Sequence, residues 1–92
     1  MYREKKDILA DIFEMLVRKY FYVPFLDNNS FRIHYKGVVY DVLAIRIDED
    51  DIPIAECVSY SPYKLVHLEI SDLSIRTITL IYKKLVNSFD EE

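Results

Sequence analysis

The fold is decided by the segment Phe31–Ile70, which reads FRIHYKGVVY DVLAIRIDED DIPIAECVSY SPYKLVHLEI. Its apolar residues fall into four short runs, and a turn signal separates each run from the next. Short runs rich in β-branched and aromatic residues, bounded by turn residues, are typical of β-strands. The segment therefore predicts four antiparallel strands that follow one another in a meander.

The turns predict how these strands pair. Lys36 and Gly37, the only glycine of the chain, form a two-residue hairpin signal that pairs Tyr35 with Val38. The same register sets Arg32 opposite Asp41, a favourable cross-strand charge pair. At the second turn, Asp48–Asp51, a symmetric loop would place opposite one another Ile47 and Ile52, Ile45 and Ile54, and Ala44 and Ala55. At the third, Ser61-Pro62, the expected pairs are Tyr60 and Tyr63, Cys57 and Val66, and Glu56 and His67.

Side chains alternate between the two faces of a strand, so this register divides the sheet into two unequal faces. One face is nearly pure core: Phe31, Ile33, Tyr35, Val38, Tyr40, Val42, Ala44, Ala55, Cys57, Val66, Leu68 and Ile70. The other carries charged residues together with an excess of apolar ones: Leu43, Ile45, Ile47, Ile52, Ile54, Val58, Tyr60, Tyr63 and Leu65.

Two explanations account for that excess. A β-bulge near Ala44 would turn Ile45 and Ile47 into the core. Alternatively, the second face carries an exposed apolar patch of the size that marks an interaction site. We favour the patch, because the apolar pairs fall on both sides of the acidic turn. A bulge in one strand would turn inward only the apolar residues of that strand.

One helix is predicted before the sheet segment in the sequence and another after it. From about Arg3 to Tyr20, helical spacing indicates a core-facing stripe of Leu9, Ile12, Phe13, Leu16 and Tyr20. After the sheet, Ser71 or Ser74 is the expected N-cap of a second helix whose seam is Ile75, Ile78, Tyr82, Leu85 and Phe89. The expected fold is α+β: helix, four-stranded antiparallel meander, helix (αββββα), with both helices on one sheet face and residues 1–92 in a single domain.

Composition narrows the class of protein. The 92 residues carry 12 Lys and Arg against 16 Asp and Glu, a net charge of −4, and the positive residues are scattered, so we expect no nucleic-acid partner. A single cysteine excludes an intrachain disulfide and fits a reducing compartment. Asp11 and Glu14 interrupt the N-terminal apolar stretch, which argues against a signal peptide or membrane span. We expect a cytoplasmic protein with no membrane partner.

No motif predicts catalysis, a cofactor or a metal. The acidic run Asp48–Asp51 fails as a calcium loop because Pro53 stands where the sixth position needs glycine. His34 and His67 are separated by two strands of the expected sheet and lack further ligands. Cys57 faces inward and His67 outward, which separates a nucleophile from its base. We therefore expect a protein that is not an enzyme and has no catalytic, cofactor-binding or metal-binding residues.

The remaining feature is the apolar outer face. It predicts a non-catalytic protein-interaction module, a homodimer or a binder of another protein, that uses the nine apolar residues from Leu43 to Leu65 given above. An alternative is a small-ligand-binding domain with an aromatic pocket at the first helix–sheet junction, formed by Phe21, Tyr22 and Phe25.

Overall fold

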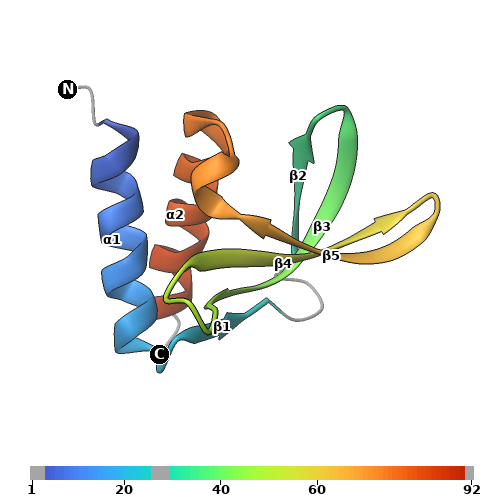
Figure 1. Cartoon of the computed structure of the whole chain (residues 1–92). Helices are drawn as coiled ribbons and strands as arrows, with labels where there is room; N and C mark the ends of the chain where they lie inside the picture. Colours follow the sequence, from blue (N-terminus) through green and yellow to red (C-terminus); the bar gives the residue numbers. More distant parts are fainter. Residues whose placement is uncertain (1–3, 26–29, 91–92) are drawn as a thin grey trace.

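The computed structural model of the chain describes residues 4–25 and 30–90. Two helices lie side by side and cover one face of an antiparallel sheet, called here the inner face (Figure 1). The elements are α1 (Lys5–Arg18), β1 (Tyr22–Pro24), β2 (Phe31–Tyr35), β3 (Val38–Ile47), β4 (Pro53–Tyr60), β5 (Tyr63–Glu69), a 3-10 turn η2 (Ile70–Asp72) and α2 (Ile75–Asp90). The expected α+β order of helix, meander and helix is confirmed.

The described sheet has five strands, because the aromatic segment after α1 adds the short strand β1. β3 is central: β4 pairs along one of its edges, while β2 and β1 share the other edge. β2 pairs with Val38–Val42, and β1 pairs with Ala44–Arg46. The sequence did not indicate β1, because it is only three residues long and ends in a proline.

The first and third hairpins have the predicted register. Tyr35 pairs with Val38 and Arg32 with Asp41, whose side chains form an ion pair at 3.0 Å. The third hairpin pairs Tyr60 with Tyr63, Cys57 with Val66 and Glu56 with His67, as expected. Both connections have two residues between paired strand ends, so the loop length alone determines the pairing.

The predicted register of the second hairpin is wrong by one residue near its turn. Ile45 pairs with Ala55 instead of Ile54, and Ile47 with Pro53 instead of Ile52. Asp51 adopts a left-handed conformation with φ 63°, and the Asp48 amide donates to the Ile52 carbonyl oxygen at 3.0 Å. This geometry closes a three-residue loop between Asp48 and Ile52, so the symmetric four-residue loop Asp48–Asp51 expected from the sequence does not form.

A β-bulge at Leu43 explains why the predicted β3–β4 register holds at Val42 and is wrong by one residue from Ala44 onward. The β3–β4 pairing shifts between Val42 and Ala44, which leaves Leu43 as the extra residue. Beyond the bulge, Ile45 and Ile47 lie on the inner face, and Ala44, predicted there, instead pairs with Glu56 on the outer face. Of the two explanations for the apolar excess, the bulge therefore accounts for Ile45 and Ile47.

The core lies between the helices and the inner face. α1 contributes Ile8, Ile12 and Leu16, and α2 contributes Ile78, Ile81 and Leu85, all at most 5% exposed. Two residues of the predicted α1 stripe are exposed: Phe13 is 37% exposed, and Tyr20, which lies beyond the end of the helix, is 90% exposed. At α2, Ser74 Oγ accepts from the Thr77 amide at 3.2 Å, so Ser74 is the N-cap.

Two hairpin ends project beyond the helices (Figure 1). The β3–β4 pairing begins at Asp41 and Val58, so the ends of the β2–β3 and β4–β5 hairpins separate past these residues. The turn between β3 and β4 lies at the opposite end of β3, beside the C-terminal part of α1 (Figure 1). The sheet thus has a half that the helices cover and a half that they leave open.

Candidate interaction surface

The structure divides the nine predicted surface residues into exposed and buried sets. Leu43, Tyr60, Tyr63 and Leu65 are exposed, at 37%, 61%, 70% and 63%. Ile52 is partly exposed, whereas Ile45, Ile47, Ile54 and Val58 are buried, at no more than 9% exposed. The expectation that all nine form one open surface is therefore wrong for the last four.

The buried residues are covered for two different reasons. The bulge places Ile45 and Ile47 in the core under the helices. Ile54 and Val58 stay on the outer face, but each lies between longer side chains on the flanking strands, Ile54 between Arg46 and Glu69. Long charged side chains cover apolar surface with their stems, which explains how an outer-face residue is only 4% exposed.

The three most exposed of the nine residues form a tyrosine patch, defined as Tyr60, Tyr63 and Leu65. All three lie on the outer face of the projecting β4–β5 hairpin. The Tyr60 and Tyr63 rings stand edge to face with centroids 5.9 Å apart, and Leu65 pairs across the strands with buried Val58. The patch is therefore a continuous apolar surface on a hydrogen-bonded hairpin, with both rings held by their cross-strand contact.

A polar pair borders this patch. Arg32 Nε donates to Asp41 Oδ1 at 3.0 Å, and Asp41 pairs with Val58 next to the patch. A hydrogen bond from the Tyr60 hydroxyl to Asp41 raises the pKa of Tyr60 above its usual value. Asp41 therefore lies between Arg32 and the hydroxyl of Tyr60 at the border of the patch.

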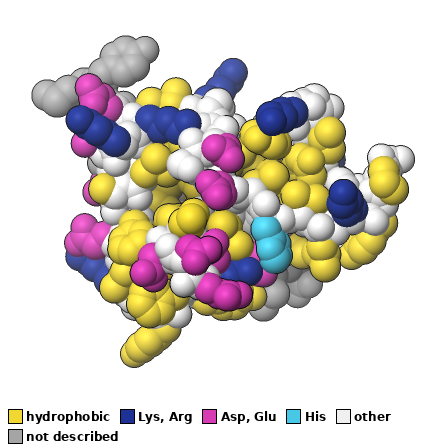
Figure 2. All heavy atoms as spheres, viewed as in Figure 1, with side chains coloured by type: hydrophobic (Ala, Val, Ile, Leu, Met, Phe, Trp, Pro, Cys, Tyr) yellow, Lys and Arg dark blue, Asp and Glu magenta, His cyan; other side chains and the backbone are white. Residues whose placement is uncertain are grey.

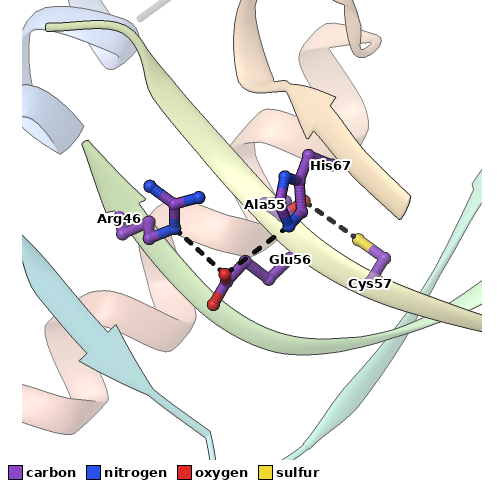
Figure 3. Close-up of polar contacts among 5 residues, drawn as sticks. All are labelled: Arg46, Ala55, Glu56, Cys57 and His67. Atoms are coloured by element: carbon purple, nitrogen blue, oxygen red, sulfur yellow. Dashed lines mark hydrogen bonds and ion pairs between the residues drawn. The ribbon is translucent and has the colours of Figure 1, made fainter. Parts of the chain in front are cut away.

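A second polar cluster crosses the middle of the outer face (Figure 3). Glu56 on β4 accepts from Arg46 Nε on β3 at 3.0 Å, and His67 Nε2 on β5 lies 3.6 Å from the same oxygen. The Arg46 and Glu56 side chains are each 27% exposed. This half-buried cluster connects three strands and has no nucleophile, so its geometry supports a structural role.

Cys57 is turned away from that cluster (Figure 3). It belongs to the core, fully buried, with its Sγ 3.5 Å from the Ala55 carbonyl oxygen. Burial raises the pKa of the Cys57 thiol from 9.0 to about 12, and the charge of Glu56 adds to the effect. A thiol of this kind is protonated near neutral pH and is a poor nucleophile.

The acidic turn has a local role. Asp48 Oδ1 accepts from the amides of Asp50 and Ile52, both at 2.9 Å, as an aspartate does when its side chain stabilises a turn. In residues 4–25 and 30–90, no three His, Cys, Asp or Glu side chains group as a metal site would need. Neither described helix is long and apolar enough to cross a membrane.

The three residues of the predicted aromatic pocket differ in burial. Phe25 is buried, with its ring edge to face against Phe31 at 5.1 Å between centroids. Phe21 and Tyr22 are both 49% exposed. An open hollow does lie between the helices, but its lining is mostly polar: Asp11, Glu14, Met15, Arg18 and Tyr82. Such walls are unlike the apolar lining of a small-molecule pocket.

Compared with protein-family models, curated proteins and solved structures, the chain shows no match. The candidate site therefore depends on the geometry alone. Sequence reasoning identified the tyrosine patch but missed the exposure of Phe13, Val17 and Tyr20 at the other end of the molecule. Phe13 and Val17 are four residues apart, the spacing of a second apolar stripe along α1, and that signal was present in the sequence.

Proposed function

We propose that this protein is a non-catalytic protein-interaction module that forms a homodimer through the tyrosine patch. The observation that carries the proposal is the exposure of Tyr60, Tyr63 and Leu65, each more than 60% exposed on one projecting hairpin. Tyrosine combines a large apolar area with few rotatable bonds, so it loses little conformational entropy when it is buried in an interface.

The size of the patch is compatible with a weak dimer. A fully buried aromatic side chain contributes 150–250 Å², so the exposed parts of the three residues offer roughly 300–400 Å² per copy. A standard interface buries about 800 Å² per partner. Flanking exposed side chains of the outer face, such as His67 and Arg32, would supply the remainder, and we expect a dissociation constant in the micromolar range.

The charges around the patch suit a second copy. The three patch residues are uncharged, so two copies meet there without repulsion. The border offers one cation, Arg32, and one anion, Asp41. A two-fold axis brings the same surface of both copies together, which allows Arg32 of one copy to face Asp41 of the other. Complementary border charges favour this orientation.

The test is the solution mass measured by light scattering over a range of protein concentrations. We expect the wild type to be dimeric at high concentration and Leu65→Asp to be monomeric, because the carboxylate would be buried in an apolar interface. Ile75→Asp is the matched control: it places the same charge at a residue that is 41% exposed on α2, and it should leave the dimer unchanged. A wild type that stays monomeric throughout, or a Leu65→Asp variant as dimeric as the wild type, refutes the proposal.

A further inference from the structure

α1 carries a second apolar stripe on the side away from the core. We define the outer stripe as Phe13, Val17, Tyr20 and Phe21, which are 37%, 44%, 90% and 49% exposed. The buried stripe of the same helix, Ile8, Ile12 and Leu16, already supplies its contacts with the core. A helix that packs on one side only needs one apolar stripe, so the outer stripe has no role in the core.

The backbone holds the aromatic end of the stripe in place. Tyr20 and Phe21 both adopt left-handed conformations, with φ 57° and 69°, which bulky residues rarely do. The Phe21 amide donates to the Leu16 carbonyl oxygen at 2.7 Å, and the Phe21 carbonyl oxygen accepts from the Ile47 amide at 3.0 Å. The stripe therefore ends at a point fixed to both α1 and β3.

An acidic rim lies beside this stripe. Figure 2 shows Asp and Glu side chains gathered where the β3–β4 turn lies, next to hydrophobic side chains over the lower part of α1. Glu49, Asp50 and Asp51 are exposed there, and the described part of the chain supplies none of them with an ion pair.

Three cations at the C-terminal end of α1 and on β3 are already engaged. Arg18 pairs with Glu14 at 3.2 Å, Arg46 donates to Glu56, and Lys19 lies 4.7 Å from the centre of the Phe89 ring. The rim is therefore a surface of negative charge next to exposed aromatic rings. Exposed aromatic faces attract Lys and Arg as well, through cation–π contacts.

We propose that the outer stripe and the acidic rim together bind an amphipathic helix of a partner protein, whose apolar side is flanked by Lys and Arg. Apolar side chains of that helix would pack on Phe13 and Val17 at the i, i+3, i+4 spacing of helix-on-helix contacts. Its basic side chains would reach Glu49, Asp50 and the ring of Tyr20. From Phe13 to Val17 the helical part of the stripe is about 6 Å long, about one turn of a helix, and Tyr20 and Phe21 extend it past the end of α1.

Charge argues against a second copy at this surface. A second copy of the chain carries a net charge of −4 and would meet this acidic surface with more carboxylates than basic side chains. Like charges set against each other across an interface disfavour the complex. The proposed occupant is thus a different protein with a basic helix, and this surface is separate from the tyrosine patch.

The experiment measures binding of a fluorescent peptide by anisotropy. The probe is a lactam-stapled helix of about 14 residues with leucines on one side and lysines and arginines beside them. Its matched control has glutamate at every basic position. We expect the basic peptide to bind at least tenfold more tightly than the acidic one, with the difference shrinking as salt is added. Equal affinities, or a basic peptide that does not bind at its highest soluble concentration, overturn the proposal.

Variants of the protein locate the site. Val17→Asp and the double change Glu49→Lys, Asp50→Lys should each weaken binding of the basic peptide at least tenfold, and the double change should strengthen binding of the acidic one. Leu65→Asp, in the tyrosine patch, should leave the affinity unchanged. Loss of binding with Leu65→Asp, or none with Val17→Asp, contradicts the assignment to α1.

Two further measurements distinguish a loss of binding from a loss of folding and from self-association. Tyr20→Gly removes an aromatic ring at a left-handed position, where glycine is the favoured residue, so the variant should keep or raise its melting temperature while binding weakens. Light scattering of Val17→Asp addresses a second copy: if this change, and not Leu65→Asp, abolishes self-association, the surface binds another copy of the chain and the proposal is wrong.

Discussion

The two halves of β4 differ in what covers them. In the helix-covered half, Ala55 and Cys57 are fully buried, whereas Tyr60, at the projecting end of the same strand, is 61% exposed. The sequence of β4 is about equally apolar at both ends. Ala55 and Cys57 lie on the inner face, which α1 and α2 cover, whereas Tyr60 lies on the outer face near the hairpin end, so both the face of the strand and the distance from the helices decide whether an apolar residue joins the core.

One sheet thus serves two purposes. Under the helices, apolar side chains stabilise the fold because they are removed from water. Beyond the helices, side chains such as Tyr63 and Leu65 stay exposed to water and contribute little to the stability of the fold. Their apolar area becomes useful only when another molecule covers it. Three predictions probe this division, beginning with the largest effect.

Truncation in the two halves should have opposite consequences. Ile45→Ala leaves a cavity beneath the helices and should lower the free energy of unfolding by about 2–5 kcal/mol. Leu65→Ala, in the projecting half, should change it by less than about 0.5 kcal/mol. Urea denaturation at a concentration where both proteins are monomeric measures the two values. Similar losses at the two sites would show that the projecting half belongs to the core.

The pH dependence of the free energy of unfolding tests the burial of the Cys57 thiol in the covered half. Its pKa is about 12 in the folded state against 9.0 for an unperturbed thiol, so the folded protein retains the proton while the unfolded chain loses it. The associated stability is complete below pH 9 and is lost as pH rises from 9 towards 12. At pH 10 the loss should be about 1.4 kcal/mol, one pKa unit being about 1.36 kcal/mol.

The comparison with Cys57→Ala isolates this contribution from the tyrosines and lysines that titrate in the same range. The variant should be less stable at neutral pH but should lose less stability than the wild type between pH 8 and pH 10. Parallel pH profiles for the two proteins would mean that water reaches the thiol in the folded state.

The smallest effects are expected at the turns. Asp51, at the covered end of β3, and Lys36, at a projecting end, both have positive φ. Glycine adopts that conformation without steric cost, so Asp51→Gly and Lys36→Gly should each raise the free energy of unfolding by about 0.5–1 kcal/mol. Glu49→Gly is the control, because Glu49 is not among the residues with positive φ and glycine there only adds flexibility to the unfolded chain. Thermal denaturation ranks the three variants, and a gain at Glu49 equal to that at Asp51 would contradict the strain argument.

The sequence predicted the parts of the fold that local chemistry determines. Gly37 and Pro62 indicated tight turns, and both registers are confirmed. The apolar excess suggested a bulge near Ala44 as one of two explanations, but neither glycine nor proline marks Leu43, so local chemistry did not decide in favour of the bulge. The left-handed Asp51 was equally hidden, since aspartate occurs in many turn conformations.

The same limit applied to the candidate surface. Alternation along β4 and β5 placed Tyr60, Tyr63 and Leu65 correctly on the outer face, because the turn at Pro62 fixed their register. It could not show which outer residues the neighbouring side chains would cover, so Ile54 and Val58 were expected to be exposed and are not. On α1, two overlapping apolar stripes left the buried side ambiguous, and Phe13 was assigned to the wrong one.

The central position of β3 has a consequence for the order of folding. Its partners β2 and β4 are its neighbours in sequence, so both hairpins close short loops and can form within microseconds. β1 and α1 come before these hairpins in the chain, and α2 follows them, so the contact between α1 and α2 closes almost the whole chain. We expect the meander to be the folding nucleus and the meeting of the two helices to be the slow step that completes the core.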